Sequence, residues 1–235
     1  MYKRILLKLS GEQLQGNLDS GFDIERARWI ANEIKPLQKE GKQIVIMIGG
    51  GNYARGSQFE SEQIQRVTAD NIGMLATLMN ALALSSVLNA EGISSRALSS
   101  IQADQVVDQF THRRALSHLD KGRVVIIAGG IGRPYLTTDT AAVSLALELD
   151  CEIVLKATKV DGVFNKDPSK FSDATKYDTI SYDEALANVD INVMDKAALG
   201  LAMEHKKPIR VFALLKEGNI RLAIDTTDIG TLIGS

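Results

Sequence analysis

Cysteine is almost missing from this chain of 235 residues, in which Cys151 is the single example. One cysteine cannot form an internal disulfide, and structural disulfides are typical of proteins from oxidising compartments. The apolar residues 153–155 that follow favour a buried thiol at this position. We therefore expect a reducing, cytoplasmic location.

An excess of positive charge is missing too, because 27 Lys and Arg stand against 29 Asp and Glu and give a net charge of −2. Nucleic-acid-binding proteins carry a basic field, so nucleic acid is not expected as a partner. The apolar runs are strand-sized, so no membrane span is expected. The first residues form a strand pattern, and no signal peptide is expected.

No metal site is predicted, since the histidines share no ligand spacing. They are His112, His118 and His205.

Short β-branched runs alternate with longer helical patterns along the chain. Strands are predicted at residues 4–9, 43–48, 123–128, 152–156 and 209–212. Helices are predicted at residues 24–39, after the N-cap Asp23, and at 63–88, 138–149 and 196–205. This alternation predicts an α/β fold in which helices cover both faces of a largely parallel sheet.

Loops that contain glycine or Asp-Gly follow four of the predicted strands, at residues 8–11, 49–52, 129–132 and 159–162. Ligands of parallel sheets bind at the carboxyl ends of the strands. Glycine allows the backbone to approach a ligand closely. The four loops together therefore predict a surface that holds polyanions.

The triple glycine at residues 49–51 exposes consecutive N–H groups that can surround a phosphate. Arg55 follows and is suited to bidentate phosphate contact. A tight strand-to-helix turn is the alternative interpretation. The P-loop pattern G-x-x-x-x-G-K-[ST] is absent, and Gly130 and Gly132 lack the third glycine of a dinucleotide fingerprint.

Two carboxylates and one aromatic residue are candidates for ligand contact. Asp70 either binds a ligand or pairs with Arg66, four residues earlier on the same predicted helix. Asp139 lies at a helix start, which is typical of an anion site. It either takes part in that site, with a lysine or metal beside it, or caps the helix. Phe164, in the polar segment 156–168, either covers an adenine ring or packs into the core.

These segments together resemble the amino acid kinase superfamily, and in particular its bacterial uridylate kinases. The resemblance extends from Lys8 to about Gly230. Residues 156–163 (Lys-Ala-Thr-Lys-Val-Asp-Gly-Val) resemble the uridylate kinases in particular, whereas the triple glycine and Lys-x-x-Gly are shared across the superfamily. Residues 131–134 read Ile-Gly-Arg-Pro where these kinases usually have Thr-Gly-Asn-Pro.

The resemblance implies a three-layer αβα sandwich with a largely parallel central sheet. It implies a single amino acid kinase domain over residues 1–235, with an N-terminal acceptor-binding lobe and a C-terminal ATP-binding lobe. The implied reaction is magnesium-dependent phosphorylation of UMP to UDP by ATP, in pyrimidine nucleotide biosynthesis. A homohexamer with nucleotide effectors, GTP or UTP, is implied as well.

The resemblance also implies the residues that act. The expected catalytic residues are Lys8, Arg55 and Asp139. The expected ATP-binding residues are Lys8, Leu9, Ser10, Gly11, Gly51, Arg55, Thr158, Phe164 and Asp167. The expected UMP-binding residues are Gly50, Asp70, Ile131, Gly132, Arg133, Pro134, Tyr135, Leu136, Thr137 and Thr138.

The expected mechanism is positioning and charge neutralisation. Lys8 balances charge on the transferred group, glycine N–H groups hold its oxygens, and Asp139 orients Lys8 or helps to hold magnesium. Two other functions stay open. One is a superfamily kinase for a carboxylate or carbamate, against which Asp70 as a ribose acceptor and residues 156–163 argue. The other is a non-catalytic nucleotide-binding regulatory module, against which Lys8, Arg55 and Asp139 argue.

Overall fold

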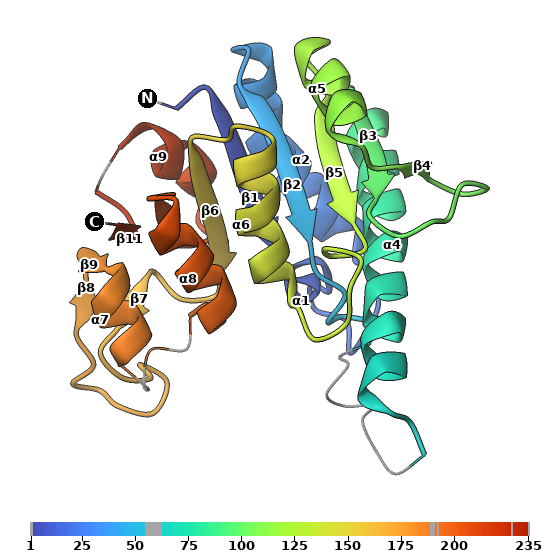
Figure 1. The fold of residues 1–235 in the computed structure, drawn as a ribbon. Helices are drawn as coiled ribbons and strands as arrows, with labels where there is room; N and C mark the ends of the chain where they lie inside the picture. Colours follow the sequence, from blue (N-terminus) through green and yellow to red (C-terminus); the bar gives the residue numbers. More distant parts are fainter. Residues whose placement is uncertain (1, 55–62, 189–190, 192, 227, 235) are drawn as a thin grey trace.

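A central sheet of nine strands organises the part of the chain that the structure, a computed structural model, describes (Figure 1). The described residues are 2–234 without 55–62, 189–190, 192 and 227. The strand order is β4-β3-β5-β2-β1-β6-β10-β11-β9. Neighbouring strands are parallel except for the antiparallel pair β10 and β11.

The sheet strands and the two strands of a separate small ribbon, β7 and β8, have the following bounds: β1 Arg4–Leu9, β2 Gln43–Ile48, β3 Ser95–Ser99, β4 Asp108–Gln109, β5 Val124–Ala128, β6 Ile153–Thr158, β7 Val163–Phe164, β8 Lys176–Tyr177, β9 Thr179–Ser181, β10 Ile209–Ala213 and β11 Thr231–Gly234. The helices are α1 Gly11–Leu14, α2 Ile24–Lys39, α4 Arg66–Ala90, α5 His112–Asp120, α6 Thr138–Glu148, α7 Tyr182–Ala187, α8 Lys196–Glu204 and α9 Asn219–Asp225.

The sheet separates two hydrophobic cores, because successive side chains of a strand point to opposite faces of the sheet. In β1, Ile5 and Leu7 belong to the core under α2, α4 and α9. Leu6 belongs to the core under α5, α6, α7 and α8. Helices therefore lie on both faces (Figure 1), and the predicted three-layer αβα sandwich is confirmed.

Most predicted elements are present with small changes at their ends. β1, β2 and α2 have the predicted bounds, and Asp23 caps α2 by accepting bonds from the N–H groups of Glu25 and Arg26. Cys151 is buried, as predicted, and burial raises the pKa of its thiol to about 12. The strand pattern did not predict β3, whose sequence Ser-Arg-Ala-Leu-Ser is largely polar, or the short elements after residue 160.

Helix α4 corrects the expectation of strand-sized apolar segments. Among the described helices it alone is long and apolar enough, by length and composition, to cross a membrane. One such helix is weak evidence, since core helices of soluble proteins pass the same test. Leu78, Ala81, Leu84 and Leu88 of α4 are buried in the core beside α2, so packing explains their apolar character.

The four predicted polyanion loops lie at one edge of the sheet. They follow β1, β2, β5 and β6, which are parallel and consecutive in the order β5-β2-β1-β6. Parallel strands end at the same edge, so residues far apart in sequence meet there. The predicted position of the four loops at one edge of the sheet is confirmed, and the binding of polyanions there stays a prediction.

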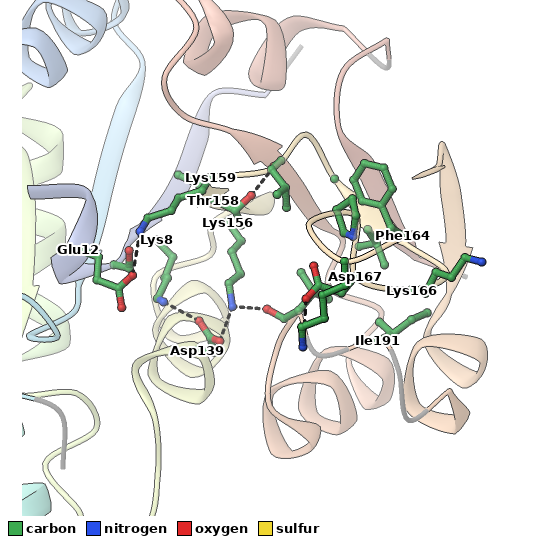
Figure 2. Close-up of a pocket in the computed structure, with 18 of the residues that line it drawn as sticks. Lys8, Glu12, Asp139, Lys156, Thr158, Lys159, Phe164, Lys166, Asp167 and Ile191 are labelled. Carbon is green, nitrogen blue, oxygen red and sulfur yellow. Dashed lines mark hydrogen bonds and ion pairs between the residues drawn. The ribbon is translucent and has the colours of Figure 1, made fainter. Parts of the chain in front are cut away.

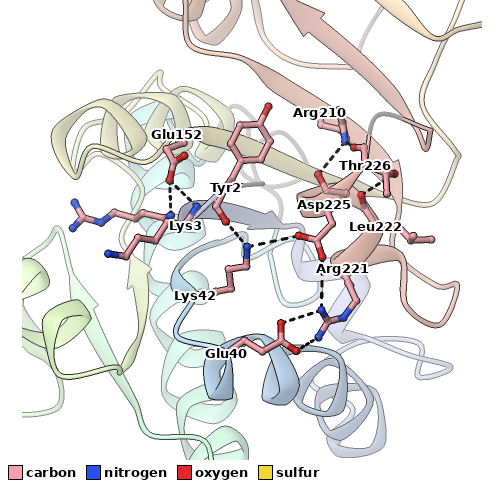
Figure 3. A network of polar contacts seen from close by, with 12 residues as sticks. Tyr2, Lys3, Glu40, Lys42, Glu152, Arg210, Arg221, Leu222, Asp225 and Thr226 are labelled. Atoms are coloured by element: carbon pink, nitrogen blue, oxygen red, sulfur yellow. Dashed lines mark hydrogen bonds and ion pairs between the residues drawn. The ribbon is translucent and has the colours of Figure 1, made fainter.

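Ion pairs hold the opposite edge of the sheet, where the strands begin (Figure 3). Arg221 of α9 contacts Glu40, which follows α2, with its nearest N–O pair at 2.6 Å, and this hydrogen bond lowers the pKa of Glu40. Lys42 donates to the Tyr2 carbonyl at 2.6 Å and lies 3.7 Å from Asp225. These contacts tie α2 and α9 to the first strands, away from the polyanion loops.

We predict that Gly230→Ala destabilises the protein far more than Gly122→Ala. Both glycines have positive φ, 67° and 68°, so an alanine costs about 1–2 kcal/mol at either position. A Cβ at Gly230 would also overlap the carbonyl oxygen of Val211, whereas one at Gly122 would meet nothing within 4 Å. Urea denaturation measures both free energies of unfolding, and equal losses would contradict the packing argument.

Candidate active site

The larger of two cavities at this edge has a volume of about 1240 Å³ (Figure 2). Its wall combines the end of β1, the start of α6, strand β6 and the segment that follows β6. Both ammonium groups and aromatic rings line it, which suits a ligand with a charged end and a flat apolar end. The lining residues used below are Lys8, Ser10, Glu12, Thr137, Asp139, Lys156, Thr158, Lys159, Phe164 and Asp167.

A carboxylate between two ammonium groups forms the charged end of this cavity. Asp139 Oδ1 lies 2.9 Å from Lys8 Nζ, and Asp139 Oδ2 lies 2.5 Å from Lys156 Nζ. The three side chains are only 9%, 13% and 12% exposed for Lys8, Asp139 and Lys156. The predicted orientation of Lys8 by Asp139 is therefore present as a direct contact, and Asp139 does not cap α6. That cap is Thr137, whose hydroxyl accepts from the Asp139 N–H at 3.0 Å.

Burial and charge act on this cluster in opposite directions. Burial alone raises the pKa of Asp139, but Lys8 and then Lys156 lower it, and the net pKa is below the usual value. Burial also lowers the pKa of Lys156, with Asp139 opposing and Lys8 adding to the decrease. Two ammonium groups and one carboxylate give these three residues one net positive charge, and the nearby carboxylate of Asp195 opposes part of it by raising the pKa of Lys156. Such a group is suited to bind an anion in the cavity.

The helix start beside this cluster is held by a second carboxylate, that of Asp195. It accepts hydrogen bonds from the hydroxyls of Thr137 and of Thr140, and it caps α8 through the Ala198 N–H. Lys156 also donates to the carbonyl of Val193, two residues before Asp195. The ends of α6 and α8 are thus joined around the charged end of the larger cavity.

The outer part of the larger cavity contains charged and aromatic side chains from the segment after β6 (Figure 2). Lys159 lies 3.3 Å from Glu12 of α1. Phe164 is half-buried and lines the cavity, which favours the predicted ring-covering position over the core. Asp167 accepts from the Ser169 N–H and hydroxyl, and these bonds lower the pKa of Asp167.

A smaller cavity of about 330 Å³ adjoins the larger one, and Thr137 lines both. The glycine loop, α4 and the loop before α6 form its wall. Its lining residues are Gly50, Gly51, Ala54, Arg66, Asp70, Gly73, Met74, Thr77, Gly130, Arg133, Leu136, Thr137 and Thr138.

Close packing explains the glycine at position 50 of the loop. A Cβ on Gly50 would lie 2.8 Å from the Cβ of Ala76 and from the Gly73 carbonyl oxygen, so only glycine fits between this loop and α4. Asn52 and Asn80 exchange two hydrogen bonds of 2.9 and 2.7 Å and are both buried. Asn80 also donates to the Gly49 carbonyl at 2.7 Å. The loop is therefore a fixed part of the wall, and the tight-turn interpretation describes its backbone.

Asp70 both pairs within α4 and faces the smaller cavity. Its two oxygens accept from Arg66 Nε at 2.9 and 3.0 Å, as the alternative interpretation stated. Oδ2 also accepts from the N–H of Tyr135, at 2.8 Å. Tyr135 has a φ of 67°, a strained value for a residue with a side chain. A carboxylate accepts about four hydrogen bonds, so Asp70 retains capacity for a ligand donor.

Only some of the expected ATP-binding residues line the larger cavity. Lys8, Ser10, Thr158, Phe164 and Asp167 line the larger cavity. The side chain of Leu9 is fully buried in the core, and Gly11 packs against the glycine loop, so only their backbones remain for a ligand. Gly51 lines the smaller cavity instead. Arg55 lies outside the described residues.

The expected UMP-binding residues divide in the same way. The smaller cavity is lined by Gly50, Asp70, Arg133, Leu136, Thr137 and Thr138. The neighbouring loop residues Ile131, Gly132, Pro134 and Tyr135 are not among its lining residues. Ile131 packs against the core on the α6 side, and a Cβ on Gly132 would lie 2.9 Å from the Ser100 carbonyl oxygen.

Sequence reasoning did not assign roles to three residues that shape the site. Lys156 forms the second contact to Asp139, Asp195 holds the start of α6, and the Thr77 hydroxyl accepts from the Gly129 N–H at 2.7 Å. Lys156 and Asp195 lie in segments that the resemblance includes. Their roles depend on strand register and helix packing, which no local pattern gives.

The carboxylates that line the larger cavity all contact protein groups in the described part of the chain. Both oxygens of Asp139 contact ammonium groups, Glu12 contacts Lys159, and Asp167 contacts Ser169. Among the described residues, no group of three or more His, Cys, Asp or Glu is placed to hold a metal ion. Of the two expected roles of Asp139, the geometry therefore favours the orientation of Lys8.

The chain is similar to known proteins over nearly its full length. The family model described as the amino acid kinase family matches residues 3–213. A uridylate kinase from Dichelobacter nodosus is 44% identical over 232 residues, which cover 99% of this chain and 96% of the relative.

Two solved structures have the same fold throughout. A UMP kinase from Bacillus anthracis has a TM-score of 0.94 and 40% identity, and the match covers 99% of this chain and 96% of that one. A UMP kinase from Ureaplasma parvum has a TM-score of 0.92 and 32% identity, with both chains fully covered. By fold, by sequence and by the lysines and glycine loops at one edge of its sheet, the chain belongs to the amino acid kinase family.

Proposed function

We propose that this chain is a uridylate kinase, which transfers the γ-phosphoryl group of ATP to a phosphate oxygen of UMP and forms UDP and ADP. The full-length relatives named uridylate kinase and UMP kinase support this proposal. The structural observation that carries it is the pair of adjoining cavities, in which Thr137 lines both and Asp139 and Lys8 lie beside it in the larger one. Two separate ligands can meet there.

The larger cavity is suited to ATP and the smaller one to UMP. The larger cavity joins the polar end at Lys8 to the aromatic Phe164, which matches a triphosphate and an adenine ring. The smaller cavity contains Asp70, a hydrogen-bond acceptor for a ribose hydroxyl, and Arg133, a cation for a phosphate. The residues that line the smaller cavity all lie between Gly50 and Thr138, which supports the proposed division into an acceptor lobe and an ATP lobe, although Lys8, Ser10 and Glu12 line the larger cavity.

The reaction needs charge neutralisation more than proton transfer. The acceptor oxygen belongs to a phosphate and is already ionised at neutral pH, so no strong general base is required. A bond forms between this oxygen and the γ-phosphorus, and the bond to the bridging oxygen of ADP breaks. Lys8 lies where it can neutralise the charge of the transferred group, and Asp139 fixes its ammonium.

Magnesium belongs to this proposal as a part of the Mg-ATP substrate. The described carboxylates of the cavity contact lysines or Ser169, so the nucleotide phosphates would hold the ion. No step of the transfer is assigned to a protein-bound metal.

We extend the proposal to the assembly and the setting of the enzyme, on the resemblance alone. The chain forms a homohexamer, responds to a nucleotide effector, GTP or UTP, and acts in the cytoplasm in pyrimidine nucleotide synthesis. Sedimentation velocity with and without these nucleotides measures the assembly, and a fully active monomer would contradict it.

The function is tested by an acceptor screen with Mg-ATP. We expect UMP to be phosphorylated faster than CMP, AMP and acetylglutamate, because Asp70 and residues 131–138 are the acceptor elements of the proposal. ADP release is measured for each acceptor. Turnover of the amino acid alone would place the chain elsewhere in the family, and turnover of no acceptor would favour a regulatory nucleotide-binding module.

We predict that Lys8→Met lowers kcat at least a hundredfold. Removal of one preorganised electrostatic donor costs about 3–4 kcal/mol of barrier stabilisation. Methionine keeps the bulk of the buried stem, and Asp139 keeps Lys156 as a partner, so the melting temperature should fall little. Steady-state kinetics and thermal denaturation separate the effects. A variant that keeps more than about a tenth of kcat would remove Lys8 from the mechanism.

We predict that Asp70→Asn raises the KM for UMP more than the KM for ATP. A charge-assisted bond to a ribose hydroxyl is worth about 1.5–3 kcal/mol, a factor of roughly 10 to 150. Asn keeps the size of the side chain and one acceptor for the Tyr135 N–H. Initial rates with each substrate varied in turn measure both constants. An unchanged KM for UMP in a protein that melts earlier would show a role confined to the pair with Arg66.

A further inference from the structure

Two phenylalanines of this chain belong to neither hydrophobic core. The chain has 6 phenylalanines, of which Phe59 lies outside the described residues. Three others pack in or against the two cores, and these are Phe22, Phe110 and Phe212. The remaining two, Phe164 and Phe171, are in neither core, and both line the larger cavity. Core packing therefore does not explain the pair of rings at the cavity.

Phe171 remains 48% exposed in the folded chain. A single apolar side chain on an open surface needs no explanation. Phe171, however, lines the same cavity as the ring of Phe164 and the ammonium groups of Lys8 and Lys156. The resemblance assigns a ligand contact to Phe164 alone, so the second ring of this cavity has no role yet.

The backbone at Phe171 is fixed by a compact turn that begins at Asp167. The Asp167 carbonyl accepts hydrogen bonds from the N–H groups of Lys170 and Phe171, at 3.1 and 3.0 Å. Asn165 and Thr175 join the two sides of the segment, because the Asn165 N–H donates to the Thr175 carbonyl at 3.0 Å and the Thr175 N–H donates to Asn165 Oδ1 at 2.9 Å. The ring is therefore carried on a hydrogen-bonded segment next to β7.

A cation also holds the ring of Phe171 from one face. Lys166 Nζ lies 5.3 Å from the centroid of this ring, within the range of a cation–π contact. The same ammonium lies 2.6 Å from Asp173 Oδ2, so Lys166 is itself fixed. A ring that is positioned before a ligand arrives loses little conformational freedom when the ligand binds.

We propose that Phe171 is a second base-contacting residue of the ATP site, which adds an aromatic surface for the adenine ring beside Phe164. This inference rests on the proposed function, in which ATP occupies the larger cavity. Adenine is flat, and stacking on an aromatic side chain stabilises any base without a particular hydrogen bond. The phosphates belong at Lys8, at the other end of the cavity, so Phe171 acts on nucleotide affinity and not on the transfer.

The test compares Phe171→Ala, Phe171→Leu and Phe171→Tyr with a matched control, Leu222→Ala. Leu222 of α9 is also exposed, at 39%, and lines neither cavity. Calorimetric titration with Mg-ATP gives Kd for each protein, and initial rates give kcat and the KM for ATP and for UMP.

The expected losses follow from what each substitution removes. Phe171→Ala should raise both Kd and KM for ATP at least about fivefold, the lower end of what one stacked base contributes. Phe171→Leu keeps apolar bulk without a flat ring and should raise them about threefold. Phe171→Tyr and Leu222→Ala, which keep the ring, should stay within about twofold of the wild type.

Two further readouts separate a base contact from a role in shaping the turn. The KM for UMP and kcat should stay within about threefold in all four variants, because the phosphates and UMP bind elsewhere. Inorganic tripolyphosphate, which has no base, should inhibit Phe171→Ala and the wild type with the same inhibition constant. An inhibition constant that rises as much as the KM for ATP would show a displaced turn and overturn the base contact.

The remaining outcomes distinguish this inference from the function on which it rests. A wild-type chain that binds Mg-ATP but does not phosphorylate UMP would refute the proposed function and leave the calorimetric test of Phe171 in force. No binding of Mg-ATP would refute both. A Phe171→Ala or Phe171→Leu protein with the wild-type affinity for Mg-ATP would overturn the base contact alone. If Phe171→Ala does not fold, Phe171→Leu decides by the same measurements.

Discussion

The contact of one carboxylate with two ammonium groups is the constraint on which the rest of this site depends. Asp139 brings Lys8 from β1, Lys156 from β6 and the start of α6 to one point. Without it, two buried lysines would lie side by side on neighbouring strands and repel each other. With it, the cluster keeps an excess positive charge in the larger cavity, close to Thr137, which lines both cavities.

The order of the strands makes this contact geometrically possible. β1 and β6 are distant in sequence but adjacent and parallel in the sheet. Helix α6, which comes directly before β6 in the chain, packs on one face of both strands. The glycine loop after β2 lies on the other side of β1 and packs tightly against α4. The glycine loop and the two lysines therefore meet at the carboxyl end of β1, while ion pairs hold the opposite edge.

Much of this arrangement could be predicted from local patterns. The spacing of apolar residues indicates the strands, and the glycines indicate where the strands end. The four loops and helix α2 were placed correctly on that basis. β3 and α5 carry too many polar residues for such a reading, and β11 pairs antiparallel at the far side of the sheet. Lys156 and Lys159 are equivalent by residue type. Strand register places Lys156 beside Lys8 and Asp139, whereas Lys159 lies after the end of β6 and contacts Glu12.

The net charge of the cluster also links stability to function. A buried group with an excess positive charge lowers the stability of the empty protein, since neither lysine is fully hydrated and the nearby Asp195 offsets only part of the excess. A bound phosphate offsets the excess positive charge. Relief of the repulsion between the lysines therefore contributes to the affinity of the site for phosphate, and binding stabilises the folded protein. Because the transferred group carries its charge between the two cavities, a cation fixed by protein contacts stabilises it without reorganisation at the moment of transfer. The feature that makes this edge of the sheet costly to fold is therefore the one that suits it to phosphoryl transfer.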